Sequence, residues 1–188
     1  TSSRDTLILY WAGHGKSESD GHYLITKDSP SKGLDPENAV FTAVLGKMVA
    51  NSSAEKVLIL LDTCYSGLGA DDIARTLSNV LSTRLPIPGA KRAYAIIAST
   101  HPLQKAQEAL YCRALTKLLS EGDKSDRWTD NDNFIYTSAL SEALEDSLGE
   151  ELGYKADKSY QRFIPNPRYR GAQPSEDAET KRRRRAIP

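Results

Sequence analysis

Cysteine and long apolar runs are both scarce in this chain of 188 residues. Its two cysteines, Cys64 and Cys112, are too few for a disulfide framework or a cysteine-rich metal site, and they suit a reducing compartment. No apolar run approaches the ~18 residues that a membrane-spanning helix needs, and no signal peptide opens the chain. We therefore expect a cytoplasmic protein without a membrane partner, a bound metal or a cofactor.

An excess of charge of one sign is also lacking, because 25 basic residues balance 25 acidic ones. The charges are unevenly placed: Lys181 to Arg185 are all basic, and without them 20 basic residues face 25 acidic ones. An acidic globular part argues against a nucleic-acid partner. We predict a globular domain over residues 1–170 and a basic linker or disordered tail over 171–188.

Short apolar runs alternate with segments of helical periodicity, which is the pattern of parallel β-α-β units. The predicted strands cover residues 7–11, 22–26, 57–61, 93–98 and 160–164. The predicted helices cover 38–51, a segment from near Ala70 to Pro86, 107–119 and 140–152, and residues 16–21 are expected to form a polar loop. This order predicts an α/β fold, a three-layer sandwich around a mainly parallel sheet.

Two of these strands end in residues that suit nucleophilic catalysis. His14 lies between two glycines after residues 7–11, and Cys64 follows residues 57–61. If the strands are parallel neighbours, both side chains reach the same sheet edge, where a thiol and an imidazole form a candidate nucleophile and base. A structural cysteine and a hydrogen-bonded loop histidine are the alternatives.

The remaining histidines and the second cysteine have less distinctive surroundings. Neither His22 nor His101 lies between two glycines as His14 does, so we interpret them as surface or loop residues. Cys112 falls at helical spacing with Leu115 and Leu119, which indicates a residue of the core.

The two motifs resemble those of a known family. Tyr10-Trp11-Ala12-Gly13-His14-Gly15 and Leu61-Asp62-Thr63-Cys64-Tyr65-Ser66-Gly67 are similar to the His-Gly and Asp-x-Cys-x-Ser-Gly motifs of caspase-like cysteine peptidases. Metacaspases and bacterial caspase-family proteins are the nearer match, and about 50 residues is the known His-to-Cys separation in caspases. The likeness extends over roughly residues 5–170, including 96–100, the helix at 107–119 and 163–169.

The resemblance implies a role for each matching residue. Cys64 would be the nucleophile and His14 the general base and acid, and the backbone amides of Gly15 and Cys64 would form the oxyanion hole. Asp62 would line the S1 pocket, where an acidic residue favours Arg or Lys at P1. A helix-capping or turn aspartate is the alternative for Asp62.

The resemblance also implies partners. Such domains open with strand, helix, strand and helix, whereas only Thr1 to Thr6 precede the histidine strand here. We expect those units to be absent from this chain, and an N-terminal segment or a sensor or ATPase module to complete the domain.

The expected partner of the site is a protein or peptide substrate. A catalytically inactive interaction module and a cysteine transpeptidase or ligase remain alternatives to an endopeptidase. The basic run 181–185 is either a solvated linker or a segment that enters the chain's own S1 pocket.

Overall fold

The computed structural model describes residues 5–83, 93–107, 109–122, 135–152, 162–165 and 186–187. The basic run 181–185 and most of the predicted tail lie outside the described residues. Ala186–Ile187 forms the short strand β9, which pairs antiparallel with β7 (Ile135–Tyr136).

The main sheet has four strands in the order β1-β5-β6-β8. They are β1 (Thr6–Ala12), β5 (Lys56–Asp62), β6 (Ala93–Ala98) and β8 (Arg162–Pro165). The first three are parallel, and β8 pairs antiparallel with β6. The expected parallel pairing of residues 7–11 with 57–61 is confirmed, since the register joins Leu7 to Val57 and Trp11 to Leu61.

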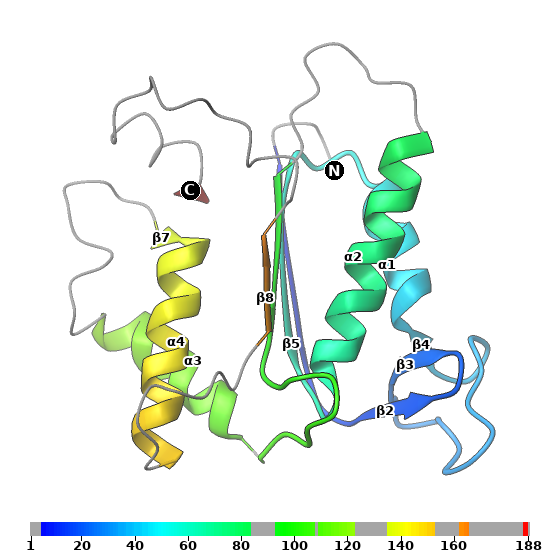
Figure 1. The fold of residues 1–188 in the computed structure, drawn as a ribbon, viewed down its shortest axis with the longest axis horizontal. Helices are drawn as coiled ribbons and strands as arrows, with labels where there is room; N and C mark the ends of the chain where they lie inside the picture. The colour runs from blue at the N-terminus through cyan, green and yellow to red at the C-terminus, as the bar shows by residue number, and fades with distance from the viewer. Residues whose placement is uncertain are drawn as a thin grey trace.

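Two pairs of helices cover the sheet. Figure 1 shows α1 (Thr42–Asn51) and α2 (Ser66–Thr83) on one face, and α3 (Leu110–Glu121) and α4 (Thr137–Leu152) on the other. The chain is therefore an α/β protein with three layers. None of the described helices combines the length and apolar character needed to cross a membrane.

Strand β5 is buried on both faces, as its uninterrupted apolar run predicts. Successive side chains of a strand point to opposite faces. Leu58 and Leu60 accordingly pack against α3 and α4 in one core cluster, whereas Ile59 and Leu61 pack against α1 and α2 in the other. This central strand carries the Cys64 turn at its carboxyl end.

The prediction of a polar loop over residues 16–21 is wrong. Gly15–Glu18 forms β2, which pairs antiparallel with β3 (Gly21–Leu24), and β3 pairs with β4 (Val40–Phe41). Polar side chains are compatible with β2 because an antiparallel strand can leave one face to solvent. This three-stranded sheet lies beyond the carboxyl end of β1 (Figure 1).

The buried face of α1 does not simply follow its apolar side chains. Met48 is 65% exposed and Val44 is exposed as well, whereas Gly46 is buried. A Cβ at Gly46 would lie 3.0 Å from the Thr76 side chain and 3.1 Å from the backbone of Ile73. The glycine lets α1 approach α2 closely, and that approach selects the buried face.

The interpretation of Cys112 as a core residue is only partly right. The Cys112 side chain is half-buried, and Leu119, its predicted partner, is 57% exposed. The buried stripe of α3 runs through Tyr111, Leu115 and Leu118.

Candidate active site

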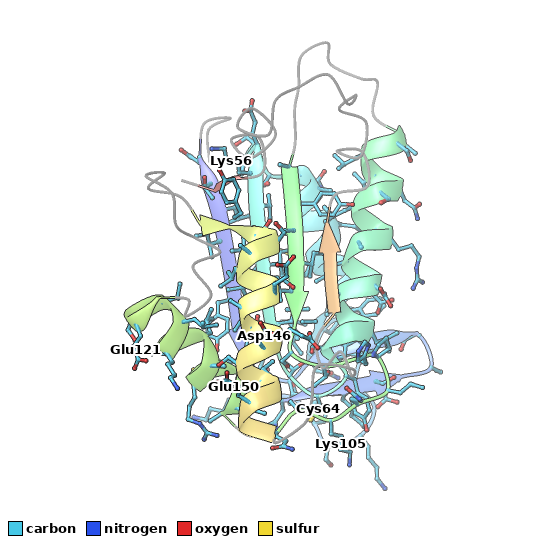
Figure 2. The ribbon with its side chains drawn as sticks, turned by 60° about the vertical axis from the view of Figure 1, so that its left-hand side comes forward. Lys56, Cys64, Lys105, Glu121, Asp146 and Glu150 are labelled. Atoms are coloured by element: carbon cyan, nitrogen blue, oxygen red, sulfur yellow. The ribbon has the colours of Figure 1, made fainter. Side chains whose placement is uncertain are left out.

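The register of β1 and β5 brings the two motifs to one sheet edge. Ala12 pairs with Asp62, and the Gly13 amide donates to the Asp62 carbonyl at 3.0 Å. His14 and Cys64 each follow this matched pair by two residues. The His14 side chain is exposed and the Cys64 side chain is half-buried. Figure 2 shows Cys64 at this end of the sheet.

Gly15 lies against the Cys64 turn. A Cβ at Gly15 would be 2.5 Å from the Cys64 carbonyl oxygen, so only glycine fits without a shift of the backbone. Gly15 is opposite Leu24, and the Ile25 amide donates to the His14 carbonyl at 2.9 Å. This pattern makes Gly15 and Leu24 a non-hydrogen-bonded pair, so the Gly15 amide points away from β3.

The peptide between Cys64 and Tyr65 is held at both ends. The Cys64 carbonyl oxygen lies 3.0 Å from Nε2 of His22 and accepts a hydrogen bond from the Thr63 hydroxyl at 3.1 Å. The Tyr65 amide donates to the Gln104 carbonyl at 2.7 Å. Tyr65 has a φ of 58°, a left-handed conformation that is unfavourable for a bulky residue and needs such restraint.

Buried hydroxyl groups join the start of α2 to the end of β6. The Ser66 amide donates to the Thr100 hydroxyl at 3.0 Å, and the Thr100 amide donates to the Ser66 hydroxyl at 3.0 Å. Ser66 also contacts the Ser99 hydroxyl at 3.3 Å. Helix α2 therefore begins two residues after Cys64, earlier than the predicted start near Ala70. Its N-terminus carries partial positive charge that can stabilise an anion at this edge.

Asp62 is buried on the α3 side of the sheet edge. Burial raises the pKa of its carboxyl group, although hydrogen bonds from the Ser99 hydroxyl and the Cys112 amide act in the opposite direction. The Cys112 amide lies in the first turn of α3, whose N-cap residue, Ala109, provides no side-chain cap. Asp62 therefore caps α3 from another element, which is the structural role considered for it from the sequence.

The interpretation of His22 as a surface or loop residue is wrong. His22 lies in β3 and is 0% exposed, because the chain folds β3 between the Cys64 turn and α2. Burial lowers the pKa of its ring. No local signal in the sequence marks this burial, since the contact with Cys64 spans 42 residues. His101 lies in the loop after β6 and is half-buried.

Three buried side-chain polar atoms have no hydrogen-bond partner among the described residues. They are Nε1 of Trp11, Nδ1 of His22 and the hydroxyl of Tyr111. Trp11 is next to the end of β1, His22 contacts Cys64, and Tyr111 is close enough to Asp62 for electrostatic coupling. Unpaired buried polar groups are rare and merit an explanation. Here they gather around the edge that carries His14 and Cys64.

Within the described part of the chain, no group of three or more His, Cys, Asp or Glu side chains could hold a metal ion. The chemistry that the edge offers is that of a thiol, an imidazole and backbone amides.

The fold defines this chain as an α/β protein. No family model matches it, and no curated protein sequence matches it either. Among solved structures, it is similar to a protein of Geobacter sulfurreducens whose crystal structure was determined as a structural genomics target. The two share 13% sequence identity with a TM-score of 0.49, over 93% of this chain and 72% of the other.

Proposed function

We propose that this chain is a cysteine endopeptidase domain of caspase-like type, with Cys64 as nucleophile and His14 as base. One observation carries the proposal: the pairing of Ala12 with Asp62 puts the residues after both strands at one edge of the sheet. The close approach of Gly15 to the Cys64 carbonyl supports it, because it joins the histidine loop to the cysteine turn. The resemblance of the two motifs supplies the reaction class.

The proposed reaction proceeds in two halves. His14 takes the thiol proton, and the Cys64 sulfur attacks the scissile carbonyl carbon. The amides of Gly15 and Cys64 donate hydrogen bonds to the resulting oxyanion. The C–N bond then breaks, His14 gives its proton to the leaving amine, and a thioester remains. Water activated by His14 hydrolyses the thioester and restores the thiol.

Asp62 is the proposed source of specificity for Arg or Lys at P1. Its carboxyl group lies at the same sheet edge as Cys64 and is buried. A basic side chain that reached it would form a charge-assisted hydrogen bond, which is among the stronger kinds. The positive charge of that side chain would also favour the ionised form of Asp62, which burial alone disfavours.

The test uses peptides that carry Arg, Lys or Asp at P1, with a fluorogenic leaving group. We expect this chain to cleave after Arg or Lys, and Cys64→Ala to abolish the activity. His14→Ala should be nearly as severe, and the double variant no worse than Cys64→Ala, because the two residues act as a unit. Substantial turnover by Cys64→Ala would contradict the assignment of the nucleophile.

Two further measurements separate the alternatives. A thiol-directed activity probe should label Cys64, with Cys112→Ser as the background that removes the other thiol. Failure to label would favour a catalytically inactive interaction module. Product analysis with an added amine should give the hydrolysed acid, and transfer of the acyl group to the amine would instead favour a transpeptidase or ligase.

A further inference from the structure

The His22 ring fills an enclosed space between β2, which follows His14, and α2, which follows Cys64. A Cβ at Gly15 would lie 2.6 Å from Nε2 of the ring, and one at Gly69 would lie 2.7 Å from Nδ1. Glycines on β2 and α2 therefore make the space that the imidazole fills. Any larger residue at either position would displace the ring.

The main chain of His22 is held as firmly as its ring. Its amide donates to Oδ2 of Asp72 at 3.0 Å, and its carbonyl accepts a hydrogen bond from the Thr42 hydroxyl at 2.9 Å. Asp72 is buried and also interacts with Arg75 at 3.3 Å. These contacts anchor β3 to α1 and α2, so the ring is a rigid support.

The hydrogen-bond partner of the ring determines its tautomer. A carbonyl oxygen only accepts hydrogen bonds, so the contact with Cys64 at 3.0 Å requires the proton on Nε2. Nδ1 then carries the lone pair, and this acceptor has no hydrogen-bond partner among the described residues. The neutral ring acts as a hydrogen-bond donor to the main chain of Cys64.

We propose that His22 is a positioning residue for the Cys64 thiol, acting through the hydrogen bond from its Nε2–H to the Cys64 carbonyl. This inference deepens the proposed function and rests on it for its catalytic meaning. The peptide that the ring contacts joins Cys64, which carries the thiol, to Tyr65, whose left-handed conformation needs restraint. Without the ring donor, the Cys64 carbonyl keeps only the hydrogen bond from the Thr63 hydroxyl, and we expect the weakened restraint to let Cys64 shift and misplace its thiol.

The test compares two amides at position 22 in the Cys112→Ser background. His22→Gln carries its amide nitrogen about where Nε2 lies, whereas His22→Asn carries it about where Nδ1 lies. The two variants are of similar polarity, so they differ chiefly in whether a donor reaches Cys64. The readout is the rate at which iodoacetamide alkylates Cys64, which requires no peptidase activity. Ser17→Ala, opposite His22 in the hairpin and exposed, is the control.

We expect His22→Asn to slow alkylation about tenfold or more, since a small misplacement of a reacting group has effects of that order. His22→Gln should stay within about threefold of the parent and of Ser17→Ala. With a cleavable peptide, His22→Asn should lower kcat and leave KM nearly unchanged, because the ring does not contact the substrate.

Equal alkylation rates for His22→Gln and His22→Asn would overturn the inference, as would a faster rate for His22→Asn. This result is distinct from failure of the proposed function. A parent chain that cleaves no peptide yet shows the Gln-to-Asn difference keeps His22 as the positioning residue of the thiol. A parent chain that cleaves peptides without that difference retains the function and loses the role of His22.

Discussion

Gly15 shows how one residue can join two separate motifs. The space that a side chain would need there is already filled, because a Cβ would lie 2.5 Å from the Cys64 carbonyl oxygen and 2.6 Å from the His22 ring. Gly15→Ala should therefore lower the free energy of unfolding by about 1–3 kcal/mol, the usual range for overpacking. Denaturant unfolding measures the effect.

Ser17→Ala is the matched control for Gly15→Ala, because Ser17 is an exposed residue of the same strand. Its stability should stay within about 0.5 kcal/mol of the parent. If Gly15→Ala were as stable as Ser17→Ala, the close contact between β2 and the Cys64 turn would not exist in solution.

Asp62 combines a structural contact with a proposed role in substrate binding, and Asp62→Asn separates the two. An asparagine oxygen can still accept a hydrogen bond from the Cys112 amide, but it carries no charge. We expect Asp62→Asn to lose most cleavage after Arg and Lys. Alkylation of Cys64 should continue at the parent rate, because Asp62 does not contact the thiol in the proposed mechanism.

The same variant has a predicted effect on stability. Burial raises the pKa of Asp62 above its usual value, so the folded state binds the proton more tightly than the unfolded state. Asp62 therefore stabilises the folded state at low pH, and this contribution is lost as pH rises through its folded-state pKa. At neutral pH Asp62→Asn should be at least as stable as the parent, and a large loss of stability would show that the charge is needed to cap α3.

At the scale of the elements, the start of α2 depends on β6. The Ser66 hydroxyl accepts a hydrogen bond from the buried Thr100 amide, and Ser66→Ala leaves that donor unpaired. We expect a loss of about 1–3 kcal/mol in the free energy of unfolding. Ser82→Ala at the other end of α2 removes only an exposed contact to Asn79 and should be nearly neutral. Similar stabilities for the two variants would contradict the buried network.

At the scale of the whole molecule, His22 makes folding stability sensitive to mild acid. Its pKa is lowered from 6.5 by burial, against the attraction of Asp72 and the hydrogen bond to Cys64. As pH falls below 6.5, the His22 ring is therefore protonated more readily in the unfolded chain than in the folded one. The free energy of unfolding then declines with a slope of at most about 1.4 kcal/mol per pH unit. His22→Gln should show a shallower decline between about pH 7 and pH 5, the range around the ordinary histidine pKa.

Unfolding curves of the parent and His22→Gln across that range provide the comparison. Asp62 is present in both chains, so its opposite pH dependence cancels in the difference between them. Parallel curves would mean that the ring is not buried in its neutral form.

The sequence alone determined the elements whose signals are local. Uninterrupted apolar runs predicted β1, β5 and β6, and such runs are typical of strands in a parallel sheet that helices cover. Helical spacing predicted the existence of α3 and α4. Motifs at two strand ends identified His14 and Cys64 as candidates, and the β-α-β order predicted that those strands are parallel neighbours.

The tertiary structure alone decided which residues surround those candidates. Pairing of β2 with β3, the approach of α1 to α2 at Gly46, and the cap that Asp62 provides for α3 all join segments whose sequences carry no sign of one another. His22 is the clearest case, because a histidine in a short polar hairpin resembles a surface residue. Its burial arises only when β3 is folded against Cys64 and α2, where two glycines leave room for its ring.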